Sequence, residues 1–147
     1  MTELKRFNLR VYGIILNDKG EVLLSTESRK GMRFTKFPGG GLQWGEGIID
    51  CLQREMMEEL GSEMQIKELF YLTEHFQLSA FSKEEQLIST YYLLGLPDGV
   101  EIPEGMESLD PEEPDNHFYW HKVEDIAIEE LTFPIDREVI KSLKNKK

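Results

Sequence analysis

The sequence predicts an α/β fold in a single domain, and three observations lead to this class. Several stretches rich in apolar, β-branched and aromatic residues predict strands. An amphipathic pattern over residues 47–60 predicts one helix, and a second pattern over residues 134–144 predicts another. The 147 residues are a usual length for one domain and can bury a sizeable core, so we expect one domain over residues 1–147.

The first two strands are expected to form a hairpin. Residues 7–16 are largely apolar, and residues 21–25 return as a second strand. Between them, Asn17 to Gly20 carry strong turn chemistry, because Gly20 adopts a positive φ at little cost. Further strands are predicted, with one or two in the first of the following ranges and one in each of the others: 66–78, 86–96 and 117–122.

Two segments outside these elements carry opposite charges. The basic segment 29–36 has four cations and no acid: Arg29, Lys30, Arg33 and Lys36. We expect a loop there, either simply solvated or acting as a collar that attracts a polyanionic substrate. Residues 97–116 contain four prolines, eight acidic residues and no base. This composition predicts an extended, mobile loop, and we favour an insertion over a lid.

Both predicted helices have an apolar stripe. With about 100° per residue, the stripe of the first helix lies within roughly 80° of Leu52. Its members are Ile48, Ile49, Leu52, Met56 and Leu60. Gly61 is expected to end this helix. The second helix opens at Pro134, which is favoured in a first turn. Its stripe consists of Ile135, Val139, Ile140 and Leu143.

Charge and cysteine content exclude some classes of protein. A net charge of -11 argues against non-specific binding to DNA duplexes or anionic membranes. A phosphorylated substrate would then need divalent cations that invert the local field.

Cys51 is the only cysteine, so no intramolecular disulfide can form, and we read it as a packing residue in a reducing compartment. Residues 1–10 lack the apolar run of a signal peptide, and no stretch approaches the ~18 apolar residues of a membrane span. We expect a cytoplasmic protein.

The most informative stretch is residues 40–62, where a glycine-rich loop leads directly into the first helix. The glycines permit close approach of the backbone to a phosphate. On the helix, Glu59 lies only about 20° from Leu52, so its carboxylate intrudes on the apolar face and is costly unless it is neutralised or coordinated. Glu55 stands one turn before it. A cation between them would turn repulsion into binding, whereas a solvated acidic face would explain Glu58 but not Glu59.

Oxygen ligands of this kind suit Mg²⁺ or Mn²⁺. Zinc would need histidine or cysteine ligands at suitable spacing. The three histidines, His75, His117 and His121, are scattered and are interpreted as ordinary strand or loop residues.

The same stretch resembles the Nudix box, G-x5-E-x7-R-E-U-x-E-E-x-G-U with U apolar. The residues in register are Gly40, Glu46, Arg54, Glu55, Met56, Glu58, Glu59 and Gly61. Ser62 departs from the pattern, because it stands where an apolar residue is expected. The Pro38-Gly39-Gly40 run and a tryptophan near the last strand are also similar to this family. The resemblance implies the Nudix fold, a mixed β-sheet sandwiched between helices (α/β/α).

The resemblance also implies roles. The implied metal-binding residues are Glu55, Glu58, Glu59 and the carbonyl of Gly39. The implied catalytic residues are Arg54, which would orient the glutamates, with Glu58 and Glu55 as candidate bases. Glutamates outside the box stay open for the base: Glu74, Glu84 and Glu85. The expected substrate-binding residues are Arg29, Arg33, Lys36, Gly40 and Gly41. Two box residues are expected to be structural: Glu46, by accepting N–H groups at the helix start, and Gly61.

The function implied is metal-dependent hydrolysis, with Mg²⁺ or Mn²⁺, of a diphosphate bond in a nucleoside diphosphate linked to another group. A nucleoside triphosphate, a nucleotide sugar and ADP-ribose all fit this description. The alternatives are a Nudix-fold sensor without turnover and an acidic protein-interaction module. The intact set of box residues favours the enzyme. Substrate markers known downstream of the box are absent from residues 76–80, and homodimers are common in the family. Four aromatic residues could stack on a base or simply pack: Phe34, Trp44, Phe76 and Phe81.

Overall fold

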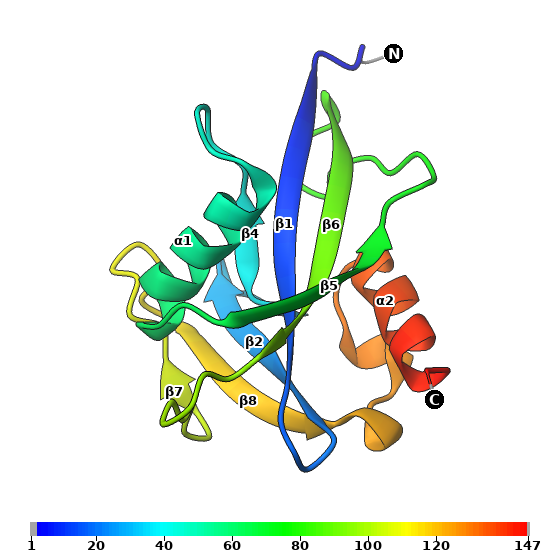
Figure 1. Ribbon diagram of the computed structural model, residues 1–147. Helices are drawn as coiled ribbons and strands as arrows, with labels where there is room; N and C mark the ends of the chain where they lie inside the picture. The colour runs from blue at the N-terminus through cyan, green and yellow to red at the C-terminus, as the bar shows by residue number, and fades with distance from the viewer. Residues whose placement is uncertain (1–2, 147) are drawn as a thin grey trace.

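The computed structural model describes residues 3–146, so three terminal residues of the predicted domain lie outside this description. Its strands and helices follow one another along the chain as Figure 1 shows. They are β1 (Arg6–Leu16), β2 (Glu21–Arg29), β3 (Met32–Lys36), β4 (Gly39–Gly41), α1 (Ile48–Leu60), β5 (Gln65–Leu72), β6 (Glu85–Gly95), β7 (Met106–Glu107), β8 (Asn116–Lys122), the 3₁₀ turns η1 (Val123–Asp125) and η2 (Ile128–Glu130), and α2 (Pro134–Lys144).

The strands form one mixed sheet with the order β5-β6-β1-β2-β8-β7. β1 lies parallel to β6 along its whole length, from the pair Arg6↔Glu85 to the pair Leu16↔Gly95. The other strand pairs are antiparallel. The predicted hairpin of β1 and β2 is present, but its two strands pair only beside the turn, at Leu16↔Val22.

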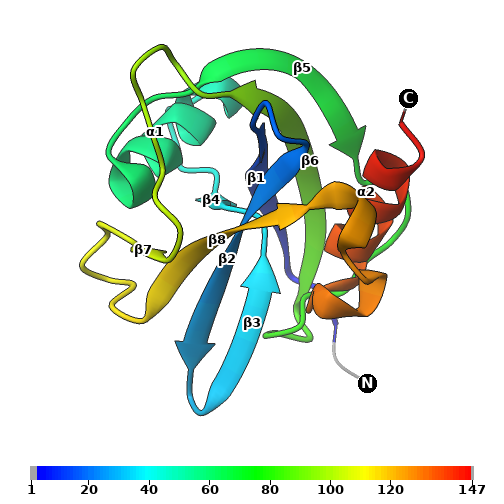
Figure 2. The ribbon, with the colours of Figure 1, turned by 90° about the horizontal axis from the view of Figure 1, so that it is seen from below.

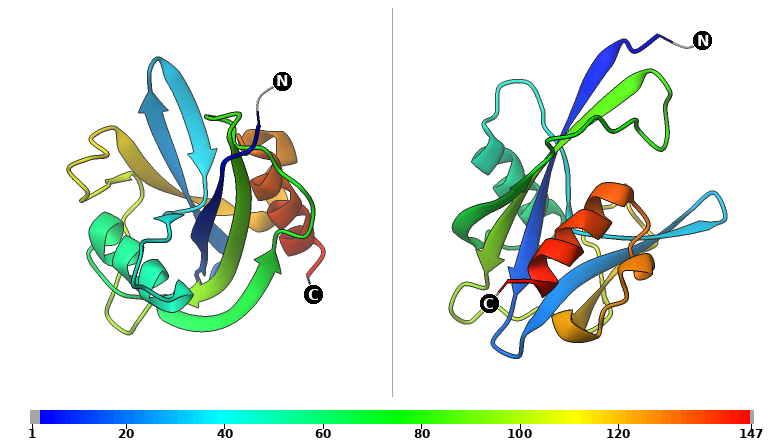
Figure 3. Two further views of the ribbon diagram at one scale, coloured as in Figure 1. Left: turned by 90° about the horizontal axis from the view of Figure 1, so that it is seen from above. Right: turned by 90° about the vertical axis from the view of Figure 1, so that its right-hand side faces the viewer.

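Beyond that turn β1 and β2 diverge, and each takes a different partner. β4 pairs with the middle of β1, and β3 pairs with the second half of β2. The two arms therefore open away from each other, as the right-hand view of Figure 3 shows. A cavity described below lies in this opening.

The basic segment 29–36 is not a loop, so that prediction was wrong. Residues 27–29 and 32–34 pair across a two-residue turn, Lys30–Gly31, and both turn residues have positive φ (52° and 77°). This backbone geometry matches the right-handed twist of a two-stranded ribbon. The segment therefore projects its side chains from a rigid hairpin, with alternate residues on opposite faces.

The two helices cover opposite faces of the sheet, as Figures 1 and 2 show. α2 packs its predicted stripe into a core that contains Ile14, Leu24 and Tyr91. α1 packs against the other face, in a core that contains Val11, Ile15 and Leu23. The predicted α/β/α arrangement is thus confirmed. No helix in the described part of the chain is long and apolar enough to cross a membrane.

One member of the predicted stripe of α1 was wrong. Ile49 is exposed, whereas Cys51 is fully buried beside Leu52 and Met56. The stripe is therefore rotated slightly toward Cys51, and this rotation also carries Glu55 and Glu59 into buried positions. Met64, just past the helix, is buried in the same core. It lies two residues after Ser62, the position at which the sequence departs from the motif.

The acidic segment 97–116 is packed against the domain rather than lying free as an extended loop. Ile102 is buried in the α1 core, and its carbonyl accepts a hydrogen bond from Trp120 Nε1 at 2.8 Å. β7 pairs with β8 inside the segment, and the Leu109 N–H donates to the carbonyl of Glu59 at 2.9 Å. The segment is thereby joined to the C-terminal end of α1.

Candidate active site

Glu59 is the most unusual side chain of α1, because its carboxylate is completely buried. Oε1 accepts the N–H of Gly39 at 3.2 Å, and Oε2 lies 3.5 Å from the Nδ2 of Asn116. Burial raises the pKa of Glu59 well above its ordinary value, while the positive charge of Lys36 opposes this shift. A buried carboxylate whose hydrogen bonds are as long as 3.2 and 3.5 Å is costly as an isolated anion and is suited to a cation partner.

Glu55 lies one turn earlier on the same face and is also buried. Its carboxylate rests against the backbone of Gly40, where a Cβ would stand 2.4 Å from Oε1. Burial raises the pKa of Glu55, and the ion pair with Arg54 works in the opposite direction. Oε2 of Glu55 receives no hydrogen bond from residues 3–146.

Arg54 connects the loop to the helix through its guanidinium group. It binds both carboxylate oxygens of Glu46, with Nη2–Oε1 at 2.8 Å and Nε–Oε2 at 2.9 Å. Nη1 donates to Glu55 at 2.9 Å and to Glu58 at 3.1 Å. Nη2 also donates to the carbonyl of Gly41 at 3.0 Å. A planar fork with five donors can hold several acceptors at once, so Arg54 fixes the positions of three carboxylates.

The carboxylate of Glu46 accepts hydrogen bonds from Arg54 rather than from the N–H groups at the start of the helix. Its hydrogen bonds with Arg54 hold its pKa well below the usual range, at about 2, and among the described residues its one backbone donor is Gln43 N–H at 2.8 Å. The N–H of Gly47 at the helix start instead donates to Asp50 at 2.9 Å. The expected capping role of Glu46 was therefore wrong. At the other end, Gly61 has φ 77° and closes the helix through the carbonyl of Met57.

Cys51 packs in the core behind this group of residues. It is fully buried, and burial is the main reason that its pKa is raised to about 12. A thiol held protonated in this way is a poor nucleophile, which agrees with its interpretation as a packing residue.

Glu113 and Asn116 were missed from the sequence, yet they lie beside the box glutamates. Asn116 is fully buried, and its Nδ2 lies 2.6 Å from Oε2 of Glu113 and 3.5 Å from Oε2 of Glu59. Burial raises the pKa of Glu113, and the positive charge of Lys36 lowers it. The only sequence signal was the density of acids in residues 97–116, which does not distinguish one acid from another.

These side chains fit a divalent cation by their chemistry. Three partly or fully buried carboxylates, Glu55, Glu59 and Glu113, repel one another, and burial raises the pKa of each. Oxygen donors of this kind are those that Mg²⁺ and Mn²⁺ prefer. In the present side-chain arrangement, no three His, Cys, Asp or Glu groups among residues 3–146 stand in metal-ligating geometry, and Arg54 lies on Glu55 and Glu58.

Lys36 carries positive charge toward the same carboxylates. Burial disfavours its charged form, yet the surrounding acids, with Glu59 first, raise its pKa. Within the described chain its amine has no carboxylate oxygen within 4.0 Å and no hydrogen-bond acceptor. Lys36 thus partly neutralises the negative charge of the acidic cluster without contacting it. Its N–H groups donate to no acceptor in the described chain.

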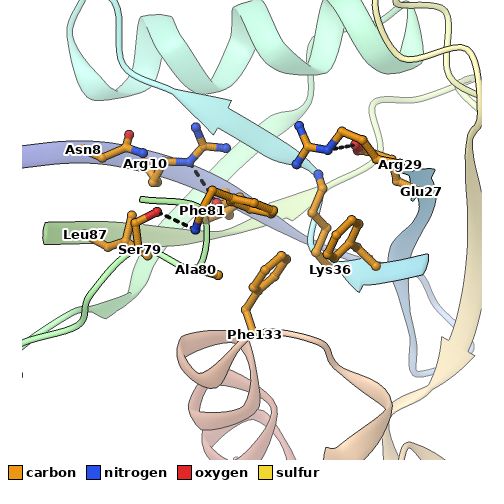
Figure 4. Close-up of a pocket in the computed structure, with 12 residues that line it drawn as sticks. Asn8, Arg10, Glu27, Arg29, Lys36, Ser79, Ala80, Phe81, Leu87 and Phe133 are labelled. Atoms are coloured by element: carbon orange, nitrogen blue, oxygen red, sulfur yellow. Dashed lines mark hydrogen bonds and ion pairs between the residues drawn. The ribbon is translucent and has the colours of Figure 1, made fainter. Parts of the chain in front are cut away.

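A cavity of about 200 Å³ adjoins this cluster, in the opening between β1 and the β2–β3 hairpin. Figure 4 shows Arg10 from β1, Arg29 from β2 and Lys36 from β3 around it, together with Phe81 and Phe133. Glu27 is the one acidic residue that lines it in the described chain. The cavity is therefore locally cationic in an acidic protein.

The structure separates the other predicted residues into two groups. Arg29 and Lys36 line the cavity, whereas Arg33 is exposed on the hairpin and does not. Gly40 and Gly41 pack against Glu55 and Arg54, so their close approach is to side chains of the box helix.

Phe34 and Phe81 line the cavity, whereas two other predicted aromatics do not, namely Trp44 and Phe76. The three outlying glutamates lie away from the box helix, with Glu84 and Glu85 paired to Lys5 and Arg6 and Glu74 beside Tyr71.

Comparison with known proteins supports the motif and the fold. The NUDIX domain matches residues 6–143 of the chain. The MutT NUDIX hydrolase from Burkholderia pseudomallei has a TM-score of 0.70 and 21% sequence identity, and the match covers 94% of this chain and 98% of that one. The MutT protein from Methanosarcina mazei Go1 has a TM-score of 0.70 and 22% identity, with 99% and 100% covered.

A UDP-X diphosphatase is also similar, with a TM-score of 0.59 and 20% identity, covering 97% of this chain and 63% of that one. Identities of this size establish a shared fold, while the domain match spans nearly the whole sequence. The loop, helix and ion pairs of the Nudix box are all found together in the structure. The chain therefore belongs to the Nudix family.

Proposed function

We propose that this protein uses Mg²⁺ or Mn²⁺ to hydrolyse a diphosphate bond in a nucleoside diphosphate linked to another group. The observation that carries the proposal is the completely buried Glu59 carboxylate, with Glu55 and Glu113 close to it. Such a group of acids is unfavourable without a cation, because burial and mutual repulsion both oppose ionisation. If these carboxylates ionise only when a divalent cation is bound, the bound cation also supplies the positive charge that attracts a phosphate substrate.

The metal ligands are drawn from this group. Glu55, Glu58, Glu59 and the carbonyl of Gly39 are the residues we assign from the box, and we add Glu113 from its position. When bound, Mg²⁺ or Mn²⁺ supplies charge neutralisation at phosphate oxygens and acidifies water. The protein itself supplies orientation, because Arg54 fixes Glu46, Glu55 and Glu58 in one ion-paired group.

Glu58 is our first choice for the general base, with Glu55 as the alternative within the box. The side chain of Glu58 is 42% exposed, so a water molecule can reach it, and it stays within 3.1 Å of Arg54. A general base must lie within hydrogen-bond reach of the proton it removes. Glu55 is held between Arg54 and Gly40 and has less freedom to accept and release a proton.

The cationic cavity supports this substrate class, and so does the name of one similar structure. One of those structures is a UDP-X diphosphatase, a name that describes a nucleoside diphosphate joined to a variable group. A net charge of -11 is compatible with such an anionic ligand only if local cations counter it, and Arg10, Arg29 and Lys36 do so here. We expect the protein to act in the cytoplasm, where a single buried cysteine stays reduced.

The test is a substrate panel with Mg²⁺, Mn²⁺ or EDTA. The panel contains nucleoside triphosphates, nucleotide sugars, ADP-ribose, dinucleoside polyphosphates and coenzyme A. We expect hydrolysis of a diphosphate bond in at least one of these compounds, present with either metal and absent with EDTA. Saturable binding of a compound without cleavage of any compound in the panel would instead identify a sensor. Equal activity in EDTA and in Mg²⁺ or Mn²⁺ would show that the reaction does not need the metal.

A further inference from the structure

Part of the sheet is left uncovered on the side of α1. Residues that pair directly across β1, β6 and β5 share a face of the sheet, so their side chains form rows. Val11, Ile15 and Leu94 of this face pack in the α1 core, and alternate residues of β1 and β6 continue it beyond the helix. The rows that α1 does not cover are what we call the open face, and its members are Phe7, Leu9, Gln86, Ile88, Thr90, Tyr92, Leu69 and Leu72.

Most side chains of the open face are apolar and accessible to solvent. The exposed fractions of four of them are 67% for Phe7, 50% for Leu69, 46% for Leu72 and 40% for Leu9. Figure 1 shows that the N-terminal halves of β1 and β6 extend beyond the ends of both helices. A contiguous exposed apolar patch usually marks an interaction site.

No member of the open face is charged. Its polar groups are the side chains of Gln86 and Thr90 and the hydroxyl of Tyr92, although 31% of the chain is charged. At the N-terminal end of β1, Lys5 and Glu84 pair with each other at 2.8 Å, so together they add no net charge beside it. The centre of a protein–protein interface is depleted of charged residues in the same way.

The open face is separate from the candidate active site. Four residues of β1 and β6 line the cavity, namely Asn8, Arg10, Tyr12 and Leu87. They alternate along the two strands with the members of the open face, so they lie on the opposite side of the sheet. A partner bound to the open face would therefore leave the cavity accessible.

The charge of the protein favours a second copy of this chain as that partner. Two molecules that each carry a net charge of -11 repel one another, so they associate most readily through a surface without charge. A two-fold axis would place the apolar side chains of one open face opposite those of the other. Three strands and four rows of side chains cover on the order of 300 Å². That area suits the apolar centre of an interface that needs about 800 Å² from each copy, including its polar rim.

We propose that two copies of this protein associate through their open faces. Phe7, Leu9, Leu69 and Leu72 lose their exposed surface in this dimer, and both cavities stay open to the solvent. The proposal does not depend on the reaction, because the cavity lies on the other side of the sheet.

Sedimentation equilibrium of the whole protein, without substrate or metal, tests the proposal over a range of protein concentrations. We expect a reversible equilibrium between monomer and dimer. Leu69→Glu should raise the Kd of the dimer by about 100-fold or more, because each dimer would hold two like charges in an apolar contact. Leu69→Lys should do the same, whereas an equal mixture of the two variants should dimerise again, since their charges are opposite. Leu72→Gln, a neutral change on the same face, should also weaken the dimer.

The matched control is Met57→Glu. Met57 is 49% exposed, close to the 50% of Leu69, but lies on α1 outside the open face. This variant should dimerise like wild type, and circular dichroism checks that every variant is folded.

Three results would each overturn the proposal. They are a wild-type protein that stays monomeric up to about 1 mM, a dimer that neither Leu69→Glu nor Leu72→Gln weakens, and a dimer that Met57→Glu weakens as much as Leu69→Glu does. Failure of the substrate panel would reject the proposed reaction and leave the dimer unaffected, since association is measured without turnover.

Discussion

The carboxylate of Glu55 lies against the backbone of Gly40, so closely that a methyl group on Gly40 would stand 2.4 Å from Oε1 and 2.5 Å from the carboxyl carbon. The glycine of the motif therefore leaves space for a glutamate that follows fifteen residues later. β4 itself pairs with β1 at Val11↔Gly40, so the strand cannot easily move away.

Gly40→Ala is expected to displace Glu55 and lower kcat by about 100-fold, because a shift near 1 Å in a catalytic group can cost that much. Steady-state hydrolysis of the substrate found in the panel measures the effect. Gly95→Ala is the control, since its methyl group would meet only the flexible ends of the Lys67 and Gln65 side chains. Equal rates for Gly40→Ala and wild type would show that the Glu55 position is not needed.

Glu59→Gln is expected to lower turnover by orders of magnitude while the protein stays folded. The substitution keeps the shape of the side chain and removes a buried negative charge, so thermal stability without metal should be unchanged or higher. Mg²⁺ or Mn²⁺ should raise the Tm of wild type and not that of the variant, because only a bound ligand stabilises the folded state. Wild-type rates in this variant would reject the metal assignment.

Glu113→Gln should weaken Mn²⁺ binding, measured by electron paramagnetic resonance on the protein and metal alone. The adjacent Glu112→Gln is the natural control, because Glu112 is exposed whereas Glu113 is bonded to Asn116. If both substitutions change Mn²⁺ affinity equally, Glu113 acts only through overall charge. A loss confined to Glu113→Gln would place the acidic segment in the metal site.

Asp136→Asn should change the pH dependence of stability. Burial is the main cause that raises the pKa of Asp136 from 3.8 to about 6, although the Tyr91 hydroxyl donates to it at 2.5 Å. The folded state therefore holds a proton that the unfolded state has lost, so this group makes the free energy of unfolding fall as pH rises from about 4 to about 6. The loss is about 1.4 kcal/mol per unit of pKa difference.

Denaturant unfolding at several pH values measures this effect. The stability of Asp136→Asn relative to wild type should increase across that window, since asparagine does not ionise. A constant difference between the two proteins at all pH values would contradict the raised pKa. Comparing variant with wild type removes the contributions of the other buried acids, which both proteins share.

Parts of the fold that depend on local pattern were predicted well. α2 spans residues 134–144 as expected, because a proline start and a four-residue apolar stripe leave little choice of boundary. The β2–β3 hairpin was missed, because Lys30 at positive φ is a rare choice for a residue with a side chain. A run of cations is also typical of a solvated loop, and it obscures the alternating pattern of β3, in which Phe34 is buried between exposed Arg33 and half-buried Thr35.

The candidate site, like the fold, has residues that the local sequence pattern predicts and residues that it does not. Arg54, Glu55, Glu58 and Glu59 could be read from the sequence, because a helix fixes the relative directions of side chains that lie within six consecutive residues. Arg10, Glu113 and Phe133 could not, since each reaches the site through long-range strand pairing or packing. The sequence by itself determined the family, the sandwich of helices and sheet, and the carboxylates on one helix. Only the tertiary structure decided which distant side chains join them, because β1 and β2 diverge after their turn and no local pattern encodes that opening.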